Sequence, residues 1–227
     1  MQCPGNCSGH GQCLHYSKSL GTVMSAEDCP IGGEGCVATC QCLDEYGGDM
    51  CELSASELER RREVRAALVD TLSNLTVSED VDTQALESWS RSLQAISLRP
   101  QELTASTATS LLSIANITLV NAGSMDDIST VSSLVGVLSA VDAAGSVLDT
   151  RHSGSNSEPT FQSTAASSVL PVINSFVTLA SQAMVVGQNT EQHSYDSFRT
   201  TSERYAFSSS EAAVLSVPSL GGDSTPA

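Results

Sequence analysis

The sequence predicts a small disulfide-rich β module followed by a mainly α-helical bundle and ending in the start of a β region. Three observations lead to this prediction. All eight cysteines of the 227-residue chain lie between Cys3 and Cys51. Apolar residues then recur at helical spacing, and aromatic residues gather near the C-terminal end. We therefore expect a disulfide module at 1–53, a helical bundle at 54–190, and a strand tract with a flexible tail at 191–227.

The dense cysteines of the first part indicate disulfides. An even number of cysteines in a short segment is typical of small secreted domains that bury too little apolar surface to fold without crosslinks. Zinc is the main alternative, but the segment has no C-x2-C pair, and His10 and His15 lack a partner pattern. We expect disulfides and no metal ion, whereas the spacing alone leaves the pairing open.

Six of these cysteines have a recognisable spacing: C-x3-C-x5-C, a 26-residue stretch, and C-x-C-x8-C. Together with the turn at 45–48 (Glu-Tyr-Gly-Gly), this segment resembles an EGF-like module. The resemblance implies that the first cysteine pairs with the third, the second with the fourth and the fifth with the sixth. Two further cysteines inside the long stretch can then pair with each other. The implied disulfides are Cys3–Cys13, Cys7–Cys40, Cys42–Cys51 and Cys29–Cys36. Only Met1 and Gln2 precede the first cysteine, so the calcium ligands of some EGF-like modules are not expected.

Apolar stripes predict five helices in the second part. The stripes are Val64, Leu68, Leu72 and Leu75; Leu86, Trp89, Leu93 and Ile96; Ala108, Leu111, Ala115 and Leu119; Ile128, Val131, Leu134, Leu138 and Val141; and Phe161, Ala165, Val169, Val172, Phe176, Leu179 and Ala183. Short helices with many Ser and Thr residues must bury these stripes against one another to be stable.

Several local signals predict where these helices begin and end. Residues 54–57 (Ser-Ala-Ser-Glu) form a capping box before the first helix. The second helix should end before Pro100, and the third should begin after Thr104 or Ser106. Loops are expected at 121–124 and 150–159, and Asp126 and Asp127 should cap the fourth helix. Pro171 should kink or split the fifth helix.

The third part reads as one or two strands. Four aromatic residues, followed by a short apolar run, favour strand over helix. They are Tyr195, Phe198, Tyr205 and Phe207, with the run Ala213–Val217.

The segments LVDTLSNLT at 68–76 and LQAISLRPQELT at 93–104 resemble the helical subdomain of GAIN-type and egg-jelly-receptor (REJ-type) modules. The resemblance covers residues 56–190 and implies that residues 193–217 begin an adjoining β subdomain. Such modules occur in ectodomains of polycystin-like channels and adhesion-type receptors, often beside EGF-like modules. Their autoproteolysis tripeptide has no counterpart here, because neither His152-Ser153 nor His193-Ser194 matches it.

The charge of the chain disfavours two classes of partner. The formal net charge is −16. Nucleic acids and anionic lipids require clustered cations, and the run Arg60–Arg62 is interleaved with glutamates at helical spacing. No run of about 18 apolar residues could span a bilayer, and no signal peptide is visible. We expect a piece of a longer secreted or membrane-anchored protein, located outside the cell or at the cell surface and without membrane contact of its own.

The sequence contains no catalytic motif, and its four histidines (His10, His15, His152 and His193) lie in predicted loops or exposed stretches. We expect neither enzymatic activity nor a cofactor. Asn74-Leu75-Thr76 and Asn116-Ile117-Thr118 are N-glycosylation sequons, so Asn74 and Asn116 are candidate glycan carriers.

These features favour a non-catalytic extracellular fragment of a cell-surface receptor or polycystin-like channel. It would bind an extracellular protein or glycan ligand, or couple mechanically to a β subdomain of the same longer chain. The short junction between Cys51 and Ser54 indicates a fixed orientation of the two modules. The alternative is a secreted matrix or adhesion protein without a membrane anchor.

Overall fold

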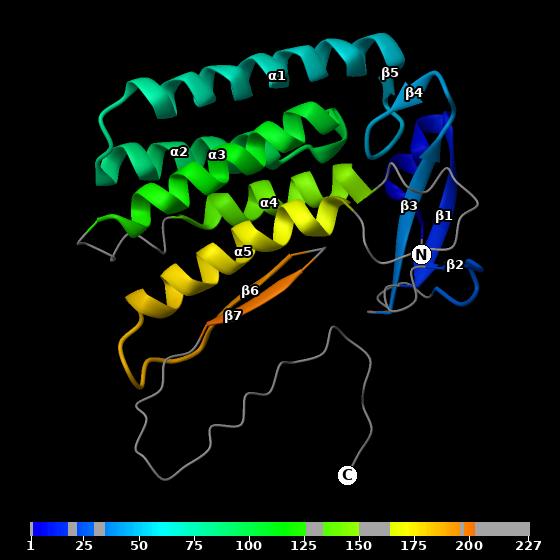
Figure 1. Cartoon of the computed structure of the whole chain (residues 1–227). Helices are drawn as coiled ribbons and strands as arrows, with labels where there is room; N and C mark the ends of the chain where they lie inside the picture. Colours follow the sequence, from blue (N-terminus) through cyan, green and yellow to red (C-terminus); the bar gives the residue numbers. More distant parts are fainter. Residues whose placement is uncertain are drawn as a thin grey trace, which may run out of the picture. The chain divides into compact units, whose positions relative to one another are not determined.

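The computed structural model of the chain (Figure 1) describes residues 2–17, 22–29, 35–125, 134–149, 164–195 and 198–202. These residues form two compact units, 2–63 and 64–202. The order of elements is the predicted one at the coarse level: disulfide-rich strands, then helices, then two strands at the end.

The first unit is built around a three-stranded antiparallel sheet of order β2-β1-β3. β1 and β3 pair along their whole length, from Gly11 opposite Cys42 to Ser17 opposite Cys36. A second pair, β4 and β5, closes the C-terminal end of the module. The elements are η1 (Pro4–Gly9), β1 (Gly11–Ser17), β2 (Val23–Met24), β3 (Cys36–Cys42), β4 (Tyr46–Gly47) and β5 (Leu53–Ser54).

The second unit consists of α-helices whose apolar faces meet in one core. Its central helix is α4, which contacts α2, α3 and α5. The helices are α1 (Ala55–Ser78, which begins in the first unit), α2 (Thr83–Ser97), α3 (Ala105–Gly123), α4 (Val135–Asp149) and α5 (Thr164–Ala183), with a 3-10 turn η2 at Pro100–Glu102. The largest fully buried side chains include Trp89, Phe176, Leu86, Leu93, Leu111 and Leu138.

The boundaries of the first three helices follow from their capping residues. The Oγ atom of Ser54 accepts the N–H of Glu57 at 3.3 Å, which is one half of the predicted capping box. The side chain of Glu57 contacts Arg60 and Arg61 instead of completing the box. Asp82 caps α2, and Thr104 caps α3 by accepting the N–H of Thr107 at 3.2 Å. The second helix ends at Ser97, before Pro100, as predicted. The polar side chains at these positions therefore set the helix starts.

The predicted stripes of the second and third helices are confirmed, because all eight of their residues are buried. The stripe predicted for the first helix is wrong. Val64, Leu68 and Leu75 are 56%, 50% and 47% exposed, and only Leu72 is buried, together with Val69. The face of α1 that meets the core carries Val69 and Leu72 together with Arg65, whose side chain pairs with buried Glu102.

One further boundary prediction is wrong. The loop expected at 121–124 is mostly helix, since α3 continues to Gly123 before Ser124 ends it. For the fifth helix, the prediction is a kink or a split at Pro171, and the split does not occur, because α5 runs through this proline from Thr164 to Ala183. Several predicted features lie outside the described residues: Asp126, Asp127, Ile128, Val131, the loop 150–159, Phe161, Tyr205, Phe207 and Ala213–Val217.

The end strands β6 (Glu191–Ser194) and β7 (Arg199–Ser202) form an antiparallel hairpin that contacts α5. The aromatic residues Tyr195 and Phe198 lie at its turn and not within its strands, and their ring centroids are 5.0 Å apart. The hydroxyl of Tyr195 donates to the carbonyl of Val135 at 3.4 Å, which fixes the hairpin turn to the start of α4.

Candidate functional site

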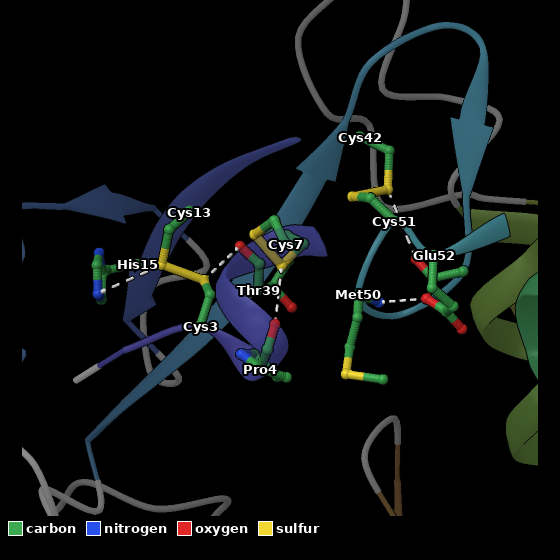
Figure 2. Close-up of a disulfide and its surroundings, with 12 residues drawn as sticks. Cys3, Pro4, Cys7, Cys13, His15, Thr39, Cys42, Met50, Cys51 and Glu52 are labelled. Atoms are coloured by element: carbon green, nitrogen blue, oxygen red, sulfur yellow. Dashed lines mark hydrogen bonds between the residues drawn. A yellow bond between two sulfur atoms is a disulfide. The ribbon is translucent and has the colours of Figure 1, made fainter. Parts of the chain in front are cut away.

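The first unit is held together by four disulfides, drawn in part in Figure 2. Their Cα–Cα distances are between 5.3 and 5.8 Å, within the normal range for the bond. The pairs are Cys3–Cys13, Cys7–Cys40, Cys29–Cys36 and Cys42–Cys51. This is the pairing that the resemblance to an EGF-like module implied. Multiple disulfides indicate an extracellular or secreted location.

The cysteines also form most of the core of the first unit. Cys3, Cys7 and Cys51 are buried, and Tyr46 packs against them. The ring of His10 stacks on that of Tyr46, with centroids 3.8 Å apart and planes inclined by 10°. Sulfur and one aromatic stack therefore replace the aliphatic core that this unit lacks.

The turn before Cys51 requires its glycine. Gly48 has a φ of +92°, and a Cβ atom there would lie 2.6 Å from a carboxylate oxygen of Glu52. The same carboxylate of Glu52 accepts the N–H of Met50 at 2.9 Å, as Figure 2 shows. A side chain at Gly48 would thus disturb the contact that shapes the turn.

The two faces of the sheet differ in character. The inner face presents Cys13 and Cys40 to the disulfide core. On the outer face, Tyr16 of β1 lies between Val23 of β2 and Val37 of β3 in one cross-strand row. Val23 and Val37 are 61% and 42% exposed. The outer face therefore offers an apolar row to solvent, a feature that often marks a contact surface.

Both candidate glycan carriers are accessible. Asn74 lies exposed on α1 and Asn116 lies exposed on α3. The hydroxyls of the two sequons are engaged in the folded chain: that of Thr76 donates to the carbonyl of Ser73, and that of Thr118 donates to the carbonyl of Ile114. A glycan on either asparagine would project from the helix surface without displacing the core.

Two of the four histidines, His15 and His193, occupy different places from those predicted, whereas His10 lies in the turn after η1. His15 is buried in β1 and His193 is half-buried in β6, where its Nε2 atom lies 3.1 Å from a carboxylate oxygen of Glu191. His152 lies outside the described residues. Side chains two residues apart in a strand lie on the same face, so the position of Cys13 in the disulfide core could have placed His15 on the inner face.

In the described part of the chain, side chains that could bind a metal ion or act in catalysis cluster at few places. The Sγ atoms of Cys3, Cys7 and Cys40 lie within 4.8 Å of one another, but all three belong to disulfides and cannot act as thiolates. Burial raises the pKa of Tyr195, and the nearby carboxylate of Asp142 adds to this effect. The hydrogen bond from Arg61 lowers the pKa of Glu57. Both shifts arise from helix packing and surface pairing.

A surface depression of about 490 Å³ lies between α3 and α5. Its lining is apolar or uncharged: Leu119, Val120, Gly123, Asn174, Ser175, Thr178, Leu179 and Gln182. No residue of that lining can exchange a proton near neutral pH. The depression is therefore suited to contact with another surface more than to acid–base chemistry.

Comparison of the chain with models of known protein families, with curated proteins and with solved structures finds no match. None of the helices in the described ranges is long and apolar enough to cross a membrane. The case for a function therefore depends on the disulfide unit and its surfaces.

Proposed function

We propose that the chain is a non-catalytic extracellular part of a cell-surface receptor or polycystin-like channel. In this proposal an EGF-like module binds a partner outside the cell. A GAIN/REJ-like helical region joins that module to a β subdomain of the same longer chain. The main support is the set of four disulfides, whose pairing is the one that the EGF-like resemblance implied.

The position of the disulfide unit adds to this support. Only Glu52, Leu53 and Ser54 separate Cys51 from the first residue of α1. So short a covalent junction suits two modules that transmit force or present a ligand together.

The helical region gives two further arguments. Glu102, in the Pro-x-Glu-Leu turn of the resemblance, is buried and bound to Arg65, so this turn has a structural role. At the other end, β6 and β7 form a sheet of two strands among the described residues. Hairpins of two strands gain stability when more strands are added, which is what a β subdomain of a longer chain would provide.

The test begins with the parent protein. The full-length transcript is sequenced, and intact cells that express the protein are labelled with an amine reagent that cannot cross membranes. We expect a membrane-spanning segment downstream of residue 227 and labelling at the cell surface. Non-reducing peptide mapping of the same material should show the four disulfides, with a glycan on Asn74 and on Asn116.

Other outcomes would distinguish the alternatives. A parent without any membrane span, found in the culture medium, would favour the secreted matrix or adhesion protein. Free thiols or bound zinc in residues 3–51 would contradict both, because neither fits an oxidising compartment.

A further inference from the structure

The strand β3 has a free edge. β3 lies at the end of the order β2-β1-β3, so its first edge pairs with β1 and its second edge has no strand beside it among the described residues. The strand is seven residues long (Cys36–Cys42), which is enough to hold an extended peptide along its length.

The register shows which backbone groups point to this free edge. The N–H of Leu43 donates to the carbonyl of His10, and in an antiparallel ladder bonded pairs alternate with non-bonded pairs. Counting from that pair, Gln41, Thr39 and Val37 direct their backbone groups toward β1. The backbone groups of Ala38 and Cys40, and those of the two end residues of the strand, therefore point outward.

The pairing of β1 with β2 leads to the same assignment of which residues bond toward which neighbouring strand. The N–H of Ser17 donates to the carbonyl of Thr22 at 3.0 Å, so alternate residues of β1 such as His15 bond toward β2. The residues between them, such as Tyr16, are then left to bond toward β3. Two independent hydrogen bonds thus agree on the orientation of β3.

Within the described strand, this edge lacks three features of sequence and register that usually prevent pairing with another chain. Such edges are commonly protected by charged residues, proline or a bulge. The sequence of β3, CVATCQC, contains neither a charge nor a proline, and its register with β1 runs without a bulge. On the outer face Val37 and Thr39 are exposed beside the free edge. β-branched residues at these positions favour β-branched or aromatic neighbours on an added strand.

Acidic residues mark both ends of the edge. Asp44 and Glu45 are exposed and follow the strand directly after Leu43. At the other end, exposed Asp28 precedes Cys29, whose Cα lies 5.8 Å from that of Cys36. An occupant with basic residues at both ends would therefore be favoured by charge.

We propose that the free edge of β3 binds an extended segment of a partner protein as a fourth strand, with β-branched or aromatic residues at alternate positions and basic residues at both ends. This inference rests on the proposed function and names the partner class of the disulfide unit. A second copy of the chain is a poorer occupant. Antiparallel pairing of two β3 strands would bring Asp44 and Glu45 of one copy toward Asp28 of the other.

The probe is the synthetic peptide KRTVTVTRK, titrated by fluorescence anisotropy against chain whose four disulfides have been verified by peptide mapping. Replacing Ala38→Pro removes an outward N–H without removing a bond to β1. The matched control Ala38→Ser keeps that N–H. We expect binding at least about tenfold weaker for Ala38→Pro and within about twofold of the original for Ala38→Ser. Asp44→Asn combined with Glu45→Gln should weaken binding and reduce its dependence on salt.

A second measurement leaves the protein unchanged. Two versions of the peptide carry N-methyl groups, one at the odd positions and the other at the even positions. In an added strand only one of these two sets of N–H groups faces β3, so only one version loses its hydrogen bonds to the strand. One methylated peptide should lose binding and the other should keep it. Amide hydrogen exchange of the chain should slow at Ala38 and Cys40 on binding, with little change at Val37, Thr39 and Gln41, which are already bonded.

Several outcomes would overturn the inference while leaving the proposed function intact. The first is that the correctly crosslinked chain does not bind the peptide. The second is that both methylated peptides bind equally well, and the third is that hydrogen exchange slows only at the amides that face β1. A chain dimer that Ala38→Pro dissociates would also overturn it, because a second copy would then occupy the edge. Missing disulfides, by contrast, would contradict the proposed function itself.

Discussion

The buried ion pair between Arg65 of α1 and Glu102 of η2 yields a quantitative prediction. The Nε atom of Arg65 lies 2.5 Å from a carboxylate oxygen of Glu102, and the two side chains are 17% and 6% exposed. Arg65 also donates to the carbonyl of Ile96 at the end of α2. Replacing Glu102→Gln keeps the shape of the side chain but leaves the guanidinium without its buried counter-charge.

The expected cost follows from the burial. Removing one partner of a buried pair costs about 3–5 kcal/mol, and the partial exposure of Arg65 places this one near the lower end, at about 3 kcal/mol. For a helical unit of this size the melting temperature should fall by about 10 °C. The assay is urea unfolding followed by the fluorescence of Trp89, the chain's one tryptophan, which is buried in the same core.

Two variants make the test decisive. Arg91→Gln removes an ion pair with Glu87 in which the side chains are 73% and 38% exposed, so it should cost less than about 1 kcal/mol. Replacing both buried partners, Arg65→Met with Glu102→Leu, should restore most of the lost stability, since apolar packing can replace a buried pair. If Glu102→Gln costs no more than Arg91→Gln, the reasoning is refuted.

Three further predictions concern the rest of the fold. Gly136→Ala should lower the free energy of unfolding by about 1–3 kcal/mol, because the added Cβ would lie 1.8 Å from the carbonyl oxygen of Ser90; an unchanged urea midpoint would contradict the close packing of α2 on α4. Burial raises the pKa of Tyr195, so its contribution to stability is complete below about pH 10 and is lost as pH rises further; Tyr195→Phe should flatten the pH dependence of unfolding above about pH 10. Reduction of the disulfides should expose residues 2–63 to protease while the Trp89 transition keeps its urea midpoint, since no cysteine lies in the helical core; a shifted midpoint would mean that the helical unit depends on the crosslinks.

The parts of the fold that sequence reasoning predicted well are those where one physical signal dominates. The stripe of α2 is apolar on one face only, and a proline follows its end, so both its core residues and its end were predictable. The grouping of strands, helices and end strands was predictable for a similar reason, because cysteine density and helical periodicity change sharply near Ser54.

The failures occur where two signals compete. α1 carries Val64, Leu68 and Leu75 on one face and Val69 with Leu72 on another, and apolar periodicity cannot choose between them. The buried face also carries Arg65, whose partner Glu102 lies 37 residues later in the chain. An ion pair between distant residues leaves no periodic trace, so a single sequence cannot reveal it.

The candidate site shows the same division. The cysteines at the site were evident, and their pairing was implied by the resemblance and not by spacing. The free edge of β3 was missed because it depends on strand order, which places β3 outside β1. The local signal was nevertheless present, since residues 36–42 form an uncharged run within the segment 1–53, which has seven acidic residues.

The two units are stabilised by different means. In the helical unit the core is apolar and includes Leu86 and Trp89 of α2 and Leu138 of α4, because apolar burial stabilises a bundle without crosslinks; large apolar side chains such as Leu68 and Val120 are nevertheless exposed on its surface. In the disulfide unit, the crosslinks take over that role and the core consists mainly of half-cystines. Val23, Val37 and Leu43 are consequently free to stand at the surface, at 61%, 42% and 60% exposure. The disulfide unit does not need these side chains for its own stability, so Val23 and Val37 form an exposed apolar row of the kind that often marks a contact surface.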